Sequence, residues 1–307
     1  MKKERYISWP PIASRYFFPV DLINVSQFDF ESVLLNYNNI KNIMLKVYIR
    51  FNKLTNGLFN IKYEQIPIPH DVIYQLIAKF EVRNKYFLFY LSDRSNKKKI
   101  TIIGYDNKLR NSIIIKTGII NFNKSNLKNE YDTLVRINNK LYVPKPVVSG
   151  EINEYFFIIT SFLKGSKLKD ININYSIICL IIKISEITPV ILKNNIYYTF
   201  SHGDFCPWNI LYFNGHYRII DWEFADYYPV GYDLFTFIFQ THYLLSNYST
   251  QKILTNNIDA IKMYFNNYNL NWKEYFIEFI KLKNDNIISI NSKKLCEKYK
   301  KAYSEYV

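Results

Sequence analysis

One short segment of the chain, SHGDFCPWNILYFNGHYRIIDWE at positions 201–223, concentrates residue types that can do chemistry. It contains the carboxylates of Asp204 and Asp221 and, between them, the amide of Asn209. An Asn-Gly pair joins two short apolar-rich runs in the segment, which predicts a type I′ hairpin because both turn positions need positive φ. The hairpin would bring Asn209 and Asp221 to one end, with Asp204 on the loop before it.

Converging carboxylate and amide oxygens are ligands that suit Mg²⁺, which takes few protein ligands and leaves room for phosphates and water. Taken singly, Asp204 and Asn209 could be turn caps, and Asp221 could be the first residue of a loop. Their joint spacing around one hairpin favours a site over these structural roles.

The pattern His202-Gly203-Asp204, then Asn209, then Ile220-Asp221-Trp222-Glu223 resembles the catalytic loop of aminoglycoside phosphotransferases and choline kinases, which share a protein-kinase-like fold. The resemblance implies that Asp204 is the catalytic residue that orients an acceptor hydroxyl. It also implies that Asn209 and Asp221 hold the Mg²⁺ ions of bound ATP or GTP. We interpret His202, Trp222 and Glu223 as structural.

The same resemblance implies nucleotide-binding residues upstream of the catalytic loop. Such a fold needs a strand lysine that reaches the phosphates and a helix glutamate that holds this lysine. Lys116 ends the strand-like run SIIIK, and Glu130 follows in a helical pattern. Backbone groups near Thr160 to Phe162 would contact the adenine. Asp233, after the metal site, is expected to be an N-cap that braces the loop.

Periodicity predicts the elements that position these residues. Strands are expected at 86–91, 100–105, 112–116 and 155–162, with a further one in the alternating run 44–51. A helix is expected at 125–138 with Ser125 or Asn126 as its N-cap. Further helices are expected at 175–188, 232–245, 251–268, 272–282 and 292–306.

This order predicts an α+β, bilobal, protein-kinase-like fold. Residues 83–162 would form the strand-rich, nucleotide-binding N-lobe. Residues 163–307 would form the helix-rich C-lobe with the catalytic loop and the metal and acceptor sites. Residues 1–82 would be an N-terminal extension, for which the sequence indicates no role.

The loop at 92–99, SDRSNKKK, departs from the kinase pattern because it has no glycine. In protein kinases a glycine-rich loop lets backbone amides approach the phosphates. Ser92, Ser95 and the lysines could supply donors instead. The absence of glycine keeps open the alternative of a catalytically impaired, kinase-fold binding protein.

Composition indicates the compartment and the class of partner. Three cysteines without paired spacing favour a reducing compartment, and the N-terminus has no apolar stretch after its basic residues, so we expect a cytoplasmic protein. The net charge is +14. A basic surface suits anionic ligands or membrane-proximal work, but no recognition module indicates nucleic-acid binding.

The sequence leaves the acceptor open. Lysines outnumber acidic residues in the helices after residue 245, which argues against a polycationic aminoglycoside. A sugar hydroxyl in surface polysaccharide or lipopolysaccharide metabolism is the first hypothesis. Choline or another amino alcohol is the second, since aromatic residues between 227 and 237 could bind an ammonium group. Core packing is the simpler reading of those aromatics.

Overall fold

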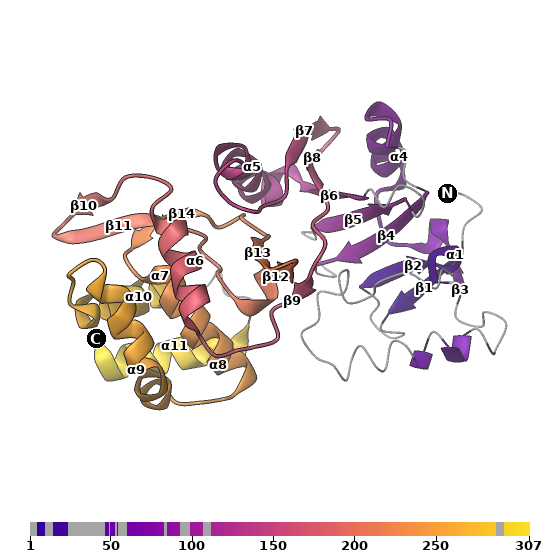
Figure 1. Cartoon of the computed structure of the whole chain (residues 1–307). Helices are drawn as coiled ribbons and strands as arrows, with labels where there is room; N and C mark the ends of the chain where they lie inside the picture. The colour runs from indigo at the N-terminus through magenta and orange to yellow at the C-terminus, as the bar shows by residue number, and fades with distance from the viewer. Residues whose placement is uncertain are drawn as a thin grey trace. The chain divides into compact units, whose positions relative to one another are not determined.

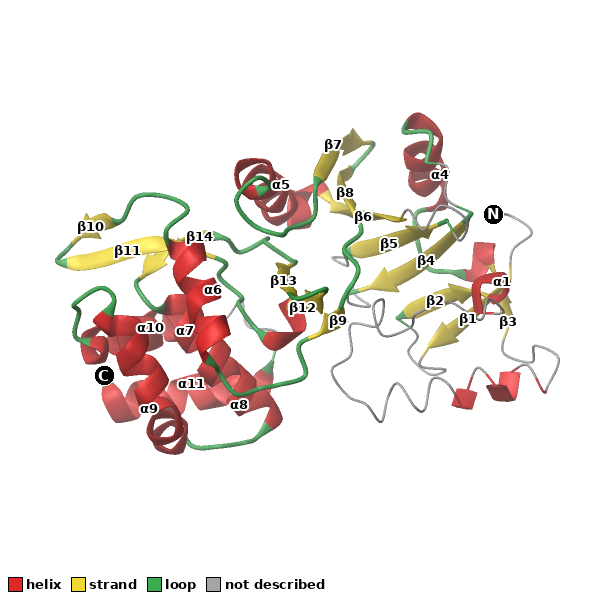
Figure 2. Ribbon diagram, in the orientation of Figure 1, coloured by secondary structure: helices red, strands yellow, loops and turns green. Residues whose placement is uncertain are grey.

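The computed structural model describes residues 5–9, 15–23, 47–48, 50–52, 54, 60–82, 85–92, 99–106, 112–286 and 292–307. Contacts along the chain divide it into two compact units, Met1–Ser166 and Lys167–Val307. Strands dominate the first unit and helices the second (Figures 1 and 2). The predicted α+β composition is therefore observed, and each unit is described below by itself.

The first unit is built on an eight-stranded sheet in the order β3-β1-β2-β4-β5-β6-β8-β7, whose pairings are antiparallel. Its strands are β1 Arg5–Trp9, β2 Tyr16–Pro19, β3 Asn60–Lys62, β4 Tyr86–Leu91, β5 Ile100–Tyr105, β6 Ser112–Ile119, β7 Pro146–Ile152 and β8 Tyr155–Ser161. Its helical segments with defined bounds are α1 Val20–Ile23, the 3₁₀ turn η1 Tyr63–Gln65, α4 His70–Lys79 and α5 Ile120–Ile137, and the described residues at 47–48, 50–52 and 54 are also helical.

Side chains from alternate positions of the strands enter two separate apolar clusters, as the period of a strand requires. Phe87 and Phe89 of β4 pack in one cluster with Leu76 of α4. Tyr86 and Leu88 of the same strand pack in the other. Because both faces of β4 are covered, the strand is apolar throughout rather than alternating.

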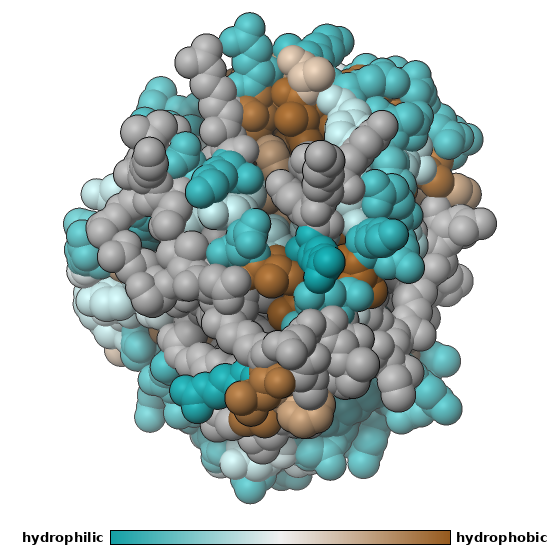
Figure 3. Space-filling model, turned by 90° about the vertical axis from the view of Figure 1, so that its right-hand side faces the viewer, coloured by the Kyte–Doolittle hydropathy of each residue, from teal (hydrophilic) through white to brown (hydrophobic). Residues whose placement is uncertain are grey.

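Three strands of the sheet, β1, β2 and β3, come from the first 82 residues, so this part of the chain shares a sheet with the strands at 86–119. The alternating run 44–51 lies partly outside the described residues. Its described positions Val47, Tyr48, Arg50 and Phe51 are helical, and the predicted strand is wrong there. Seen from the side of the first unit (Figure 3), hydrophobic residues lie in separate areas among hydrophilic ones.

The second unit combines a helical body with two small sheets, of strand order β10-β11-β14 and β13-β12-β9. Its strands are β9 Ser166–Lys167, β10 Ile191–Lys193, β11 Ile196–Ser201, β12 Ile210–Phe213, β13 His216–Ile219 and β14 Asp226–Pro229. Its helical segments are α6 Tyr175–Ser185, the 3₁₀ turn η2 Pro207–Asn209, α7 Tyr232–Phe235, the π-helical turn η3 Thr236–Gln240, α8 Thr241–Leu245, α9 Thr250–Asn266, α10 Trp272–Asp285 and α11 Lys293–Tyr306.

Aromatic rings from α7 to α11 form the core of the helical body. Phe235 lies 5.4 Å from Phe279 and 5.5 Å from Phe276, measured between ring centroids. Phe239 lies 5.1 Å from Phe276. Such contacts between aromatic rings contribute to stability beyond the burial of area alone. None of the described helices is long and apolar enough to cross a membrane.

One predicted helix start and one predicted N-cap differ from the structure. Helix α5 begins at Ile120, not near Ser125, because β6 continues into it and the Ile120 N–H donates to Glu154 O (2.9 Å). Its N-cap, Ile119, has no side-chain cap bond, so Ser125 and Asn126 are interior positions. The N-cap of α7 is Gly231 (φ 85°), so Asp233 is not a cap. In both cases tertiary contacts replace the local cap signal.

Candidate active site

The hairpin formed by β12 and β13 positions the first part of the site. Asn214 and Gly215 have φ values of 49° and 80°, as a type I′ turn requires. The strands pair from Phe213–His216 back to Ile210–Ile219. Beyond the last pair, the Ile220 N–H donates to Asn209 O (3.0 Å). The hairpin thus places the residues on either side of it, Asn209 and Asp221, at the same end.

Asp204 lies on the loop before the hairpin, and side-chain amides hold both of its carboxylate oxygens. Asn209 Nδ2 donates to Asp204 Oδ2 (3.0 Å) and also to the Asp204 carbonyl (2.9 Å). Gln240 Nε2 donates to Oδ1 (2.7 Å). Two amides fix the direction of the carboxylate without neutralising its charge.

The sequence reasoning did not identify Gln240. It lies 36 positions after Asp204 and ends the π-helical turn η3 inside the predicted helix 232–245. A π-turn changes which side of a helix a residue faces and is common at functional sites. No spacing rule points to Gln240, because the contact depends on this local irregularity.

Asp233 braces the catalytic loop from α7, although it does not cap the helix. Its carboxylate accepts the backbone N–H groups of His202 (2.7 Å) and Gly203 (3.0 Å). Gly203 has φ 85°, and a Cβ at this position would lie 2.1 Å from the Phe224 carbonyl oxygen. The loop therefore requires glycine for two reasons, conformation and space.

His202 is fully buried, and both of its ring nitrogens are engaged. The Asp204 N–H donates to Nδ1 (3.2 Å), so Nε2 carries the proton that is donated to Ile220 O (3.0 Å). The ring packs against Trp222 at 4.6 Å between centroids. This environment fits a scaffold residue that ties Asp204 to the strand leading to Asp221.

Asp221 has φ 69°, in the left-handed region that non-glycine residues rarely adopt. Its charge acts on two neighbours: it raises the pKa of Asp204, and it favours the charged form of Lys167. Burial lowers the pKa of Lys167 to about 8, and Lys167 Nζ donates to the Trp208 carbonyl (2.7 Å). Asp204, Asn209 and Asp221 are thus brought together, as the hairpin predicted.

The buried carboxylates of the site have perturbed proton affinities. Burial raises the pKa of Asp204 to about 6, against Lys283 and the amides of Gln240 and Asn209, which lower it. Burial raises the pKa of Asp233 to about 7, against its two backbone hydrogen bonds. Perturbed carboxylates of this kind cluster at functional sites.

The side-chain donors of the site suit one class of metal ion. Asn209 uses its Nδ2 as a donor, so Oδ1 remains as the oxygen of the amide that can coordinate. Among the described residues, no cluster of three His, Cys, Asp or Glu side chains could hold a metal by itself. Asn209 and Asp221 therefore fit an ion that takes most of its ligands from phosphates and water, as Mg²⁺ does.

In the first unit, Lys116 and Glu130 form a partly buried ion pair. Lys116 lies opposite Ile158 in the sheet, on the face that α5 covers. Lys116 Nζ donates to both carboxylate oxygens of Glu130, at 2.6 and 2.8 Å. The side chain of Lys116 is 12% exposed and that of Glu130 is 3% exposed. Because β6 continues to Ile119, Lys116 lies inside the strand and is not an exposed strand-end lysine. The residues named from the sequence are therefore in contact.

The stretch from Thr160 to Phe162 lies at the end of β8. Thr160 is buried between Ile114 of β6 and Pro146 of β7. The Phe162 N–H donates to Ser112 O (2.9 Å). A base bound here would have to contact backbone groups other than this N–H.

The glycine-free loop lies mostly outside the described residues, which include only its ends, Ser92 and Lys99. These two close it: the Ser92 N–H donates to Lys99 O (3.0 Å), and the Lys99 N–H donates to Ser92 Oγ (2.9 Å).

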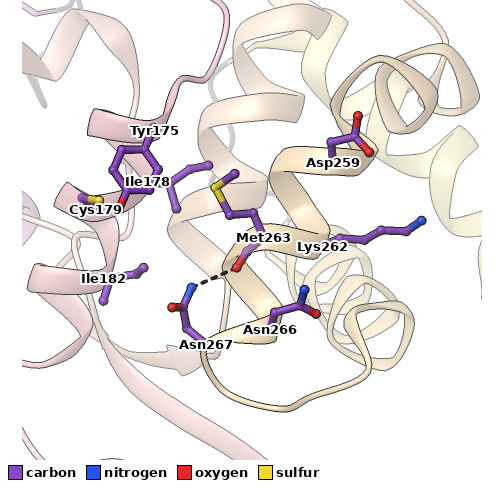
Figure 4. Close-up of a pocket in the computed structure, with 9 residues that line it drawn as sticks. All are labelled: Tyr175, Ile178, Cys179, Ile182, Asp259, Lys262, Met263, Asn266 and Asn267. Atoms are coloured by element: carbon purple, nitrogen blue, oxygen red, sulfur yellow. Dashed lines mark hydrogen bonds between the residues drawn. The ribbon is translucent and has the colours of Figure 1, made fainter.

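A separate hollow of about 420 Å³ lies between α6 and α9 (Figure 4). Tyr175, Cys179 and Ile182 line it from α6, and Lys262 and Met263 from α9. It shares no lining residue with the catalytic loop. The side-chain amide of Asn267, one of its lining residues, donates a hydrogen bond to the backbone carbonyl of Met263. We assign no role to it.

Comparison with known families gives one match, over residues 192–250, to the phosphotransferase enzyme family abbreviated APH. The matched segment contains Asp204, Asn209, Asp221, Asp233 and Gln240. No protein of curated function matches the sequence.

Solved structures share the fold at low identity. A thermostable mutant of aminoglycoside phosphotransferase APH(4)-Ia, in ternary complex with AMP-PNP and hygromycin B, is 10% identical with a TM-score of 0.50 over 76% of this chain and 97% of that one. The amicoumacin kinase hAmiN, in complex with AMP-PNP, Ca²⁺ and Ami, is 12% identical with a TM-score of 0.48, covering 78% and 96%. A putative fructosamine-3-kinase from Haemophilus somnus is 12% identical with a TM-score of 0.44, covering 77% and 96%.

These findings confirm the predicted resemblance to small-molecule phosphotransferases and the kinase-like α+β fold. The predicted enzyme class, a phosphotransferase, agrees with the matched family.

Proposed function

We propose that the chain is a small-molecule kinase that transfers the γ-phosphoryl group of ATP or GTP to a hydroxyl of its acceptor. The observation that carries this proposal is the contact of Asp204 with Asn209, beside Asp221, inside the segment that matches the phosphotransferase family. These are the residue types and the arrangement that phosphoryl transfer uses.

In this proposal Asp204 is the catalytic residue. Its carboxylate, held by Asn209 and Gln240, accepts the hydrogen bond of the acceptor hydroxyl and points the attacking oxygen at the phosphoryl group. Asn209 and Asp221 hold Mg²⁺, which when bound neutralises charge on the phosphates. Positioning and charge neutralisation, rather than covalent chemistry, supply the rate.

Lys116 and Glu130 are proposed to serve the nucleotide. An ammonium held by a buried carboxylate through two hydrogen bonds is preorganised to meet the α- and β-phosphates. Thr160 to Phe162 would contact the base through backbone groups. ATP is our first choice over GTP, because the nucleotide in the APH(4)-Ia and hAmiN complexes is an ATP analogue.

For the acceptor we propose a sugar hydroxyl, in surface polysaccharide or lipopolysaccharide metabolism in the cytoplasm. An aminoglycoside is the second candidate, favoured by the APH(4)-Ia complex with hygromycin B. The basic composition of the chain argues against a polycation, since the net charge is +14. Choline is less favoured, because Tyr232, one of the aromatic residues between 227 and 237, already lies against an ammonium of the chain itself, with Lys283 Nζ 4.6 Å from its ring centroid.

The proposal is tested by thermal-shift titration with MgATP and MgGTP, followed by a nucleotide-hydrolysis screen with sugar, amino-alcohol and aminoglycoside acceptors. A kinase gives nucleotide-dependent stabilisation and acceptor-dependent ADP or GDP formation. A catalytically impaired binding protein gives stabilisation without turnover, and the absence of both would contradict the proposed function.

A further inference from the structure

The last residue of β9 and the residue after it hold the backbone on both sides of Asn209, one of the two residues proposed to bind Mg²⁺. Lys167 Nζ donates to the Trp208 carbonyl (2.7 Å), and the Leu168 N–H donates to the Ile210 carbonyl (2.9 Å). In the same sheet, β9 lies next to β12, which begins at Ile210. Two successive residues of one segment therefore contact the residue before Asn209 and the residue after it.

The bond from Lys167 acts on the peptide group that carries the Asn209 nitrogen. A peptide group is planar, so the Trp208 carbonyl and the Asn209 N–H turn together. The Asn209 N–H donates to the Cys206 carbonyl (2.9 Å), while the carbonyl at the other end of the group accepts from Lys167 Nζ. Because both polar ends are bonded, the group cannot rotate without losing a hydrogen bond. The two bonds together fix the direction in which Asn209 leaves the turn.

A lysine supplies this donor because the turn itself is short. The 3₁₀ turn η2 ends at Asn209, and carbonyls at the end of a helical turn need partners from outside it. Lys167, which is partly buried, provides one from 41 positions earlier in the chain. A hydrogen bond from an ammonium is about twice as strong as one between neutral groups, and 2.7 Å is a distance typical of such a bond.

The side chain of Asn209 tolerates little movement of its backbone. Its Nδ2 donates to both the carbonyl and the carboxylate of Asp204, at 2.9 and 3.0 Å, so Oδ1 is the atom left for a metal. A rotated peptide group would break these contacts or turn Oδ1 away from the metal position. Groups that orient a metal ligand without touching the metal typically change its affinity ten- to hundredfold when they are removed.

We propose that Lys167 is a positioning residue of the metal site, which fixes Asn209 for Mg²⁺ through the Trp208 carbonyl. This inference rests on the proposed kinase function and adds to it a residue that lies outside the catalytic-loop motif at 202–223. A purely structural lysine would behave differently, since its loss would lower stability without a specific effect on the metal.

The test measures metal binding apart from catalysis. AMP-PNP, a non-hydrolysable ATP analogue, is titrated into the protein by calorimetry with excess Mg²⁺ and again with EDTA. We call the ratio of the two affinities the metal enhancement. Electron paramagnetic resonance of Mn²⁺, with AMP-PNP present, gives the affinity for the ion directly.

Three variants separate the two roles. Lys167→Met removes the ammonium and keeps a side chain of similar length, whereas Lys167→Arg keeps a charged donor. Lys193→Met is the matched control, because Lys193 is also the last residue of a short strand in the second unit, β10, and is exposed.

We expect the wild type and Lys193→Met to have the same metal enhancement and the same affinity for Mn²⁺. Lys167→Met should bind Mn²⁺ roughly ten- to hundredfold more weakly and lose most of the metal enhancement. Its affinity for metal-free AMP-PNP should stay within several-fold of the wild type. Lys167→Arg should restore Mn²⁺ binding to within several-fold, because a guanidinium can donate to the same carbonyl.

A metal enhancement in Lys167→Met equal to that of the wild type would overturn the inference. An equal loss of AMP-PNP affinity with and without Mg²⁺ would overturn it as well, and would leave Lys167 as a structural residue. If Lys167→Met does not fold, Lys167→Gln takes its place, since its donor is neutral and on a shorter side chain, and Mn²⁺ affinity equal to the wild type would again overturn the inference. Failure of AMP-PNP to bind the wild type under either condition is a different result, which would contradict the proposed kinase function on which the inference rests.

Discussion

At Asp204, two side-chain amides fix a buried carboxylate. Asn209 was identified from the sequence because it belongs to a motif with fixed spacing, whereas Gln240 was not, because only the π-helical turn η3 brings it to Oδ1. Motif spacing therefore predicts the residues of one loop and misses a partner that depends on helix geometry.

Replacing Gln240 should impair chemistry more than binding. In Gln240→Leu, Asp204 Oδ1 loses a hydrogen bond to a charged group, worth about 1.5–3 kcal/mol, so we expect kcat to fall roughly ten- to hundredfold. The KM for MgATP should stay within several-fold. Steady-state kinetics check this, with Gln251→Leu, at an exposed position of α9, as the control. An unchanged kcat would mean that Gln240 does not position Asp204.

Lys116 should matter for the nucleotide. Lys116→Met removes the ammonium proposed to meet the phosphates and leaves buried Glu130 without this partner, so affinity for MgATP should fall at least roughly tenfold. The control is Lys124→Met, which breaks the exposed Lys124–Glu151 pair, worth less than about 1 kcal/mol. Isothermal titration measures both. Equal affinities in the two variants would contradict the assignment of Lys116.

Among the elements, the β12–β13 hairpin and α7 hold the catalytic loop. The hairpin was predictable because an Asn-Gly turn has few conformations. The sequence indicated that Asp233 braces the loop, but as the N-cap of its helix. In the structure its carboxylate instead accepts hydrogen bonds from the backbone N–H groups of His202 and Gly203. Local cap rules could not indicate a bond between residues 30 positions apart.

Two glycines in left-handed conformations allow a matched test of the loop. Gly203→Ala places a Cβ 2.1 Å from the Phe224 carbonyl oxygen, whereas Gly215→Ala meets nothing within 4 Å. Gly215→Ala should cost about 1 kcal/mol for its conformation alone. Gly203→Ala should lower the free energy of unfolding several times more, because the backbone at Phe224 must move to make room for the Cβ. Denaturant unfolding compares them, and similar losses of stability would show that the loop is not tightly packed.

Asp233 should give the protein a pH-dependent stability. Its pKa in the folded protein, about 7, lies above the ordinary value of 3.8, so between these pH values the folded state binds more protons than the unfolded state. The free energy of unfolding should therefore fall as pH rises, by up to about 1.4 kcal/mol per pH unit.

Asp233→Asn should lack this contribution. The pKa of Asp204 is also raised in the folded protein, so Asp204 lowers stability with rising pH in the same way. The contribution of Asp233 is therefore taken from the difference in pH dependence between the wild type and Asp233→Asn. Unfolding by denaturant at about pH 5 and about pH 7.5 measures the difference. A variant with the same pH dependence as the wild type would contradict the raised pKa.

For the whole molecule, the order of a strand-rich part before a helix-rich part followed from periodicity. Strands with both faces buried, such as β4, were recognised as apolar runs bounded by polar segments. The first 82 residues gave no such signal. In the sheet of the first unit, β2 pairs with β4, and β1 pairs in turn with β2. Long-range pairing of short strands leaves little trace in local sequence.

Asp204, Asn209 and Asp221 all belong to the second unit. Asp204 is proposed to orient the acceptor hydroxyl and not to bind the nucleotide. The most direct measurement compares the wild type with Asp204→Asn in phosphoryl transfer from γ-labelled MgATP to an acceptor. Where no acceptor is supplied, the slow hydrolysis of MgATP is compared instead. We predict loss of turnover in Asp204→Asn with MgATP affinity within several-fold of the wild type. Retained turnover in this variant would contradict the account.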